Sequence, residues 1–132
     1  MASVAKSNAD AVREFAAAWN RDDWDEMEAA FWPDAQAIAP RGWPEAESPR
    51  GWEAVRRQFE RLKDPWEEEH FELESVEELD AQRALSHGRW LGSGHDGIPL
   101  DLEFWIVSRY RDGRIESVAF YFDRDEALRG AG

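Results

Sequence analysis

The chain has 132 residues, no cysteine and a formal net charge of −13, because 29 acidic side chains outnumber 16 basic ones. Its length predicts one domain, and its 42% hydrophobic content, with 8 Trp and 7 Phe, indicates an ordered aromatic core. The composition excludes disulfides, thiol nucleophiles and thiolate metal sites, and it disfavours nucleic acid and anionic membranes as partners.

The chain contains no apolar run of transmembrane length, and its first residues lack the apolar core of a signal peptide. We therefore expect a soluble, cytoplasmic protein that does not contact a membrane. The acidic runs Glu67–Glu69 and Glu77–Glu78 are interpreted as solvated surface that favours solubility.

The first half of the chain reads as three helices with one short strand and a loop between the second and third. Residues 9–20 and 52–63 place apolar side chains on one face at helical spacing. The second helix begins at Asp23, where Glu26 completes a capping-box pattern, and Pro33 ends it. The strand is expected at 35–39, and the Pro- and Gly-rich loop at 40–51.

The second half changes to the alternating pattern of strands, with a bulge expected near Ser75, where the phase of the apolar residues shifts. RDGR, residues 111–114, reads as a hairpin turn. Helices followed by strands predict an α+β fold, in which a curved antiparallel sheet wraps around about three N-terminal helices. We expect a flexible N-terminus over residues 1–9 and one domain over 10–129.

Five segments resemble the SnoaL-like branch of the nuclear transport factor 2-like superfamily. They are VREFAAAWNRDDW, FWPDAQ, SPRGWEAVRRQF, YRDGRI and FYFDRDEAL, which together extend from about Ala11 to Leu128. The resemblance implies a cone of curved sheet closed by helices, an interior pocket and frequent homodimers. The superfamily includes polyketide cyclases, ketosteroid isomerases, limonene epoxide hydrolases, dehydratases and proteins without catalysis, so the fold alone does not define the function.

The catalytic residues of these relatives are only partly matched. The three positions that ketosteroid isomerases use correspond to Phe15, Ala39 and approximately Ile106, which neither donate nor accept the required proton. The Asp-Arg-Asp set of the epoxide hydrolases has no clear counterpart. The general base of SnoaL-type cyclases, an Asp near the end of the last strand, corresponds to Asp123.

Asp123 has two interpretations with opposite electrostatic requirements. As a catalytic base it would lie among aromatic side chains, where desolvation raises the pKa of a carboxyl group. As the N-cap of a final helix it would accept backbone N–H groups, which lowers that pKa, and Glu126 completes a capping box.

Two further residues are candidates for acid–base chemistry. Tyr121 shares strand parity with Asp123, so its hydroxyl could polarise a substrate carbonyl, or it is an ordinary core tyrosine. His87, on a predicted central strand, is either a general acid–base group at the pocket or a structural residue. The chain has no metal-ligand spacing, and we expect neither a metal nor a cofactor.

The expected pocket walls are apolar. The predicted ligand-binding residues are Phe15, Trp19, Trp43, Trp90, Phe104 and Ile106. Trp43 lies in the loop from Pro40 to Pro49, where it either covers the pocket mouth or fixes the loop.

The alternation around Phe104 and Ile106 places Trp105 and Val107 on the outer face of the sheet. Apolar side chains on such a surface favour a homodimer through this face. The alternative is a partly covered outer face on a monomer.

The leading hypothesis is a pocket protein that binds a small, mostly apolar molecule. If it is an enzyme, we expect cofactor-free acid–base chemistry (isomerisation, cyclisation, dehydration or hydrolysis) with Asp123 as the base and Tyr121 and His87 as donors. The alternatives are a non-catalytic ligand-binding protein and a dimeric assembly module whose pocket is filled by side chains.

Overall fold

The computed structural model describes residues 7–40 and 48–131. Four helices and five strands lie within these residues. In chain order they are α1 (Asn8–Asn20), α2 (Trp24–Ala30), β1 (Phe31–Ile38), α3 (Trp52–Lys63), β2 (Trp66–Glu78), β3 (Arg83–Gly94), β4 (Pro99–Arg111), β5 (Arg114–Tyr121) and α4 (Arg124–Ala131).

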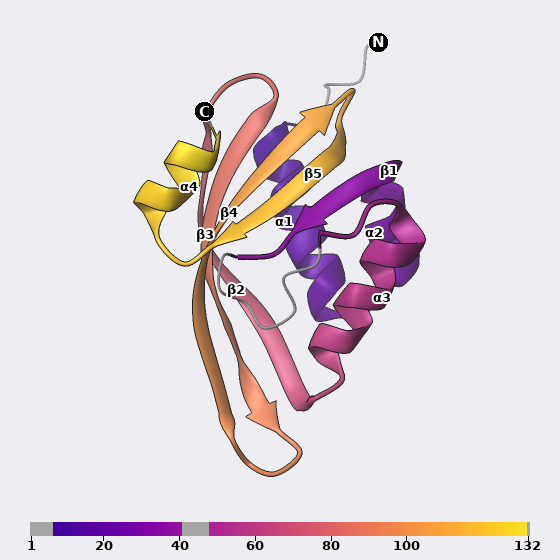
Figure 1. The fold of residues 1–132 in the computed structure, drawn as a ribbon, viewed down its shortest axis with the longest axis vertical. Coiled ribbons are helices and arrows are strands. Elements are labelled where there is room, and N and C mark those ends of the chain that lie inside the picture. The colour runs from indigo at the N-terminus through magenta and orange to yellow at the C-terminus, as the bar shows by residue number, and fades with distance from the viewer. Residues whose placement is uncertain (1–6, 41–47, 132) are drawn as a thin grey trace.

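The strands form one curved sheet in the order β1-β5-β4-β3-β2, antiparallel except for the parallel pair β1–β5. The helices α1, α2 and α3 lie on one side of this sheet, and α4 lies on the other side (Figure 1). The predicted α+β fold, a curved sheet around three N-terminal helices, is confirmed. The prediction did not include the parallel pairing of the edge strand β1 or the position of α4 on the outer face of the sheet (Figure 1).

Several local predictions also match the structure. The third helix has the expected bounds, and the register of β2 against β3 shifts between Leu73 and Ser75, where the bulge was expected. Asp112 and Gly113 both have positive φ, as a two-residue hairpin turn requires. The first strand begins earlier than predicted, at Phe31, and contains Pro33, which an edge strand tolerates because one side of its backbone is unpaired.

The curvature of the sheet depends on a close approach of β2 to β3. A Cβ atom at Gly88 would overlap the carbonyl oxygen of Glu72, and one at Gly92 would overlap that of Glu68. Both glycines face segments of β2 next to its two register shifts. Glycine is the one amino acid without a Cβ atom. Gly88 and Gly92 therefore let the backbone of β2 approach β3 closely, which allows β2 to fold inward over the helices.

The inner core is built from aromatic rings that join the helices to the first strand. Phe15 of α1 meets Phe31 of β1 edge to face, with ring centroids 5.2 Å apart. Trp19 meets Phe59 of α3 in the same way at 5.3 Å. Phe31 and Phe59 are almost fully buried, so these contacts fix the helices against the sheet.

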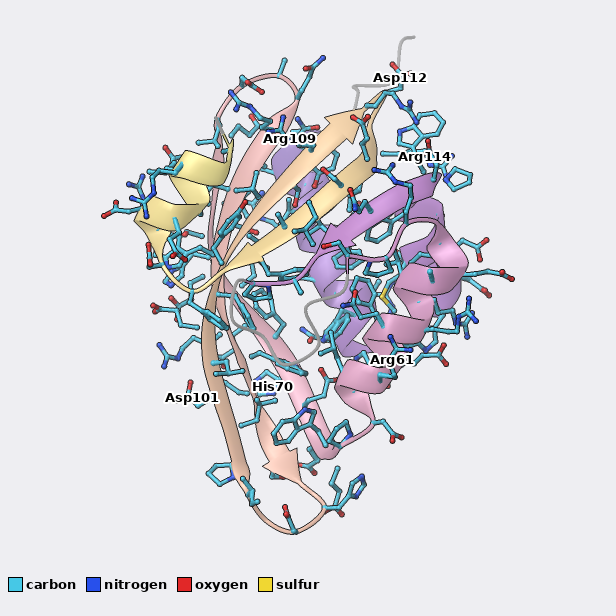
Figure 2. All side chains as sticks on the ribbon, viewed as in Figure 1. Arg61, His70, Asp101, Arg109, Asp112 and Arg114 are labelled. Atoms are coloured by element: carbon cyan, nitrogen blue, oxygen red, sulfur yellow. The ribbon has the colours of Figure 1, made fainter. Side chains whose placement is uncertain are left out.

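The outer helix α4 is held at both ends. The Asp123 side chain caps its first turn, and the guanidinium groups of Arg83 and Arg109 both donate to the carbonyl oxygen of Ala131 at its end. Arg109 extends toward α4 in Figure 2. Beneath the helix lie Leu85 and Val107, which form a second small core.

The N-terminal boundary differs slightly from expectation, because α1 begins at Asn8 with the Ser7 side chain as its N-cap. The proposed flexible N-terminus falls largely on residues 1–6, outside the described residues. Within residues 7–40 and 48–131, none of the helices combines the length and apolar character needed to cross a membrane.

Substitution of Gly92 by alanine tests the close approach of the two strands. The added methyl group meets backbone atoms of β2, so we expect the free energy of unfolding to fall by about 3 kcal/mol. Chemical denaturation followed by circular dichroism measures this change. The neighbouring Ser93→Ala is the control, and equal midpoints for the two variants would contradict the role given to Gly92.

Candidate functional site

A cavity of about 120 Å³ lies between the helices and the concave face of the sheet. Its walls come from α1, α3 and strands β2 to β5, and most of the lining side chains are aromatic or aliphatic. Ala39 and Pro40, which follow β1, also line it. The site is therefore an interior, mainly apolar pocket.

Five of the six predicted ligand-binding residues line this cavity: Phe15, Trp19, Trp90, Phe104 and Ile106. Trp43 lies outside the described residues. Phe15, Ala39 and Ile106, the counterparts of the isomerase catalytic positions, all reach the cavity wall. These three side chains are apolar, so they contribute no ionisable group to the cavity wall.

Tyr121 faces away from the cavity, contrary to expectation. Phe120 lines the cavity, so Tyr121, the next residue along β5, projects to the outer face. There it packs with Val107 and Ala127 beneath α4. The predicted alignment of Tyr121 with Asp123 is wrong because β5 ends at Tyr121, so strand parity does not extend to Asp123.

Asp123 is the N-terminal cap of α4. Its Oδ1 accepts a hydrogen bond from the backbone N–H of Glu126 at 2.8 Å, and its carbonyl oxygen accepts from Ala127 N–H at 3.2 Å. The residue is exposed and is not among the residues that line the cavity. Of the two interpretations of Asp123, this geometry matches the cap.

His87 also lies on the outer face, because its neighbour Ser86 is the residue of β3 that lines the cavity. The imidazole stacks on Trp105 with ring centroids 3.9 Å apart. Its Nδ1 lies 3.3 Å from Glu74 and its Nε2 lies 3.0 Å from Glu103. The ring joins β2, β3 and β4 on the side of the sheet opposite the cavity, so the expectation that it faces the pocket is wrong.

The outer face is partly covered by the chain itself. Val107 is only 3% exposed because α4 packs over it, and Trp105 is half-buried beneath the same helix and against His87. The expectation that Val107 is exposed is therefore wrong, and the alternative of a partly covered outer face fits, whereas the homodimer itself stays a prediction. Asp101, on the uncovered part of that face, points away from the helices in Figure 2.

A buried polar cluster beside the cavity was not expected from the sequence. Glu69 accepts hydrogen bonds from the indole nitrogens of Trp19 and Trp90, each at 2.8 Å, and from Lys63 at 2.7 Å. The Lys63 and Glu69 side chains are only 11% and 9% exposed. Lys63 also lies over the Trp19 ring, 4.1 Å from its centroid.

The interpretation of Glu69 as solvated surface is therefore wrong, whereas Glu67 and Glu68 are exposed as expected. The long-range partners explain the difference, because residues on α1, α3 and β3 surround this one carboxylate. The cluster fixes the orientation of two indole rings that form a wall of the cavity.

The polar side chains that line the cavity are Gln58, Ser86, Ser108 and Tyr110. Tyr110 is only 4% exposed, and its hydroxyl has no hydrogen-bond partner among the described residues. Burial raises the pKa of Tyr110 well above its ordinary value, and an interaction with the Ser108 side chain offsets a smaller part of this shift. The alternation of β4, extended past Ile106, was the sequence signal for Ser108 and Tyr110.

Within residues 7–40 and 48–131, no group of three or more His, Asp or Glu side chains has an arrangement that could hold a metal ion.

The curved sheet, the enclosing helices and the apolar interior define a cone-shaped α+β protein with an interior cavity. The chain belongs to the SnoaL-like family, because the family model of the SnoaL-like domain matches residues 12–118.

Solved structures share the fold of this chain. Bal32a, from a soil-derived mobile gene cassette, is 26% identical with a TM-score of 0.82, and the match covers 94% of this chain and 95% of that one. A nuclear transport factor 2-like protein of unknown function from Burkholderia pseudomallei is 24% identical with a TM-score of 0.76, over 90% and 92%. TerC, co-crystallised with polyporic acid, is 16% identical with a TM-score of 0.76, over 92% and 94%. No curated protein matches the chain in sequence.

Substitution of Glu69 by glutamine tests the buried cluster. Glutamine lacks the charge that pairs with Lys63 and replaces one acceptor oxygen by a donor, so we expect the free energy of unfolding to fall by about 2 kcal/mol. Glu68→Gln, at the exposed residue that directly precedes Glu69 on β2, is the matched control and is expected to change stability by less than about 0.5 kcal/mol. Equal denaturation midpoints would show that the cluster does not stabilise the fold.

The raised pKa of Tyr110 predicts a specific loss of stability at alkaline pH. Below about pH 10 the Tyr110 phenol is neutral in both the folded and the unfolded chain. Above about pH 10 the phenol ionises in the unfolded chain but keeps its proton in the folded chain, so the unfolded state becomes more favourable. Relative to Tyr110→Phe, the wild-type protein is expected to lose about 1.4 kcal/mol of stability between neutral pH and about pH 11. Parallel pH profiles for the two proteins in urea unfolding would contradict the burial of this hydroxyl.

Proposed function

We propose that this protein binds a small, predominantly apolar molecule in its interior cavity. The observation behind this proposal is the cavity itself, whose walls are formed largely by aromatic rings such as Phe15, Trp19, Trp90 and Phe104. Ligand sites in proteins are typically concave, mostly apolar and furnished with a few polar groups that fix orientation. The cavity has this composition.

The size of the cavity limits the ligand. An apolar cavity of about 150 Å³ in another protein takes up benzene, and the cavity here measures about 120 Å³. A ligand that fits it is therefore about the size of a single ring. Transfer of such a molecule from water into apolar surroundings is favourable because apolar surface is removed from water.

The cavity supplies no group suited to carboxylate or imidazole catalysis. Among its lining residues in the described part of the chain, Tyr110 is the one ionisable side chain. Asp123, Tyr121 and His87 all have their functional groups outside it. Binding without proton transfer by these residues is the activity that this geometry favours.

The comparisons support the proposal at the level of the fold. TerC, which shares this fold, has been co-crystallised with polyporic acid. The SnoaL-like family, to which the chain belongs, also contains proteins of very different functions on the same scaffold. The choice of ligand therefore depends on the residues of this cavity.

Titration with ethylbenzene, followed by intrinsic tryptophan fluorescence, tests the proposal. Trp19 and Trp90 line the cavity, so we expect a saturable change in their emission. Ala16→Leu adds three carbon atoms to the α1 wall and is expected to weaken binding by more than about tenfold, because the added side chain occupies the cavity. Asp123→Ala is the control variant, and it is expected to bind ethylbenzene like the wild type.

The control separates the two roles considered for Asp123. Loss of the cap is expected to lower the free energy of unfolding by about 1 kcal/mol without a change in ligand affinity. A fluorescence response that is absent, or that Ala16→Leu leaves unchanged, would contradict binding in this cavity.

A further inference from the structure

The Tyr110 hydroxyl is a polar group placed in the cavity wall without a partner in the described part of the chain. The residue is buried, it lines the cavity, and no described atom forms a hydrogen bond with its oxygen. Ser86 differs in this respect, because its Oγ donates to the carbonyl oxygen of Ile106 at 3.4 Å. A buried hydroxyl without a partner costs free energy that a bound acceptor would recover.

Three of the polar lining residues, Ser86, Ser108 and Tyr110, lie near one another on the adjacent strands β3 and β4. Ser108 and Tyr110 occupy successive inward positions on β4, and Ala84, opposite Ser108 on β3, is two residues from Ser86. On the neighbouring strand β5, Ile115 and Val118 pair with Tyr110 and Ser108. Trp90 and Phe104 line the cavity further along the same two strands, where the wall is aromatic.

The state of the phenol makes Tyr110 a hydrogen-bond donor. Burial raises the pKa of its hydroxyl above the ordinary value, so the group keeps its proton throughout the physiological range. A neutral phenol with a free O–H complements a carbonyl oxygen, which has lone pairs and no hydrogen of its own.

The charge of the ligand is restricted by the same wall. None of the lining residues within 7–40 and 48–131 bears a charge at neutral pH, so an ionised carboxylate or amine would enter without a counter-ion. An unpaired charge in such surroundings is strongly unfavourable. The cavity therefore selects neutral molecules.

We infer that the ligand is a neutral, single-ring-sized molecule with one carbonyl oxygen, and that the Tyr110 hydroxyl donates a hydrogen bond to this oxygen. The inference rests on the proposed binding function and specifies the ligand class of the same cavity. The apolar body of the ligand contacts the rings of the cavity wall, and Tyr110 selects compounds with an acceptor at one end.

Acetophenone and ethylbenzene form a matched pair for the test, because they differ mainly by a carbonyl group in place of a methylene. Their dissociation constants are measured by NMR titration for the wild type and for Tyr110→Phe. We expect the substitution to weaken acetophenone binding about tenfold, which corresponds to the loss of one hydrogen bond, and to leave ethylbenzene within about twofold. Each ligand is compared with itself in the two proteins, so the difference in hydration between acetophenone and ethylbenzene does not affect the ratio of the two changes.

Tyr121→Phe is the control, since it removes the hydroxyl of the other of the chain's two tyrosines, on the outer face. It is expected to change neither affinity. The ¹³C shift of labelled acetophenone gives a second readout, because a hydrogen bond to the carbonyl moves this resonance and Tyr110→Phe should abolish the displacement.

The outcomes separate this inference from the function on which it rests. If both compounds bind and Tyr110→Phe affects them equally, binding in the cavity stands and the assignment of a carbonyl ligand to Tyr110 is overturned. If neither compound binds up to its solubility limit, the proposed function fails, and the inference fails with it.

Discussion

The close approach of β2 to β3 is the constraint on which the rest of the structure depends. Gly88 and Gly92 lack the Cβ atoms that would hold the backbone of β2 away, and the register shifts of β2 occur beside them. A flatter sheet would leave the helices against a shallow surface, where side chains fill the space between layers. The curved sheet instead encloses a volume that the core side chains do not fill.

Two buried polar features border this volume, and they differ in how well their groups are satisfied. Around Glu69, three donors converge on one carboxylate, so the charge of the acid is balanced by Lys63 and its oxygens are occupied. At Tyr110 the hydroxyl is buried without such compensation. The first arrangement fixes part of the cavity wall, and the second leaves one polar group of the wall without a hydrogen-bond partner among the described residues.

The sequence was sufficient for the fold because local patterns determine most of its elements, as the helix at 52–63 and the alternation that turns Phe104 inward show. It was less informative about individual functional groups. Tyr121 was misplaced because strand parity was extended past the end of β5, and Glu69 was misplaced because its partners are distant in the sequence. The same alternation along β4 predicts that the Tyr110 side chain points inward. That its hydroxyl has no hydrogen-bond partner among the described residues depends on the packing of the whole cavity.

The cluster around Glu69 also has an evolutionary consequence. Three successive glutamates look equivalent in the sequence, yet two of them face solvent and tolerate drift, whereas the third is tied to side chains on three other elements. Loss of this acid would leave two indole N–H groups and one ammonium group without their shared acceptor. A substitution of Glu69 alone is therefore less favourable than one that also replaces its partners Trp19, Lys63 and Trp90.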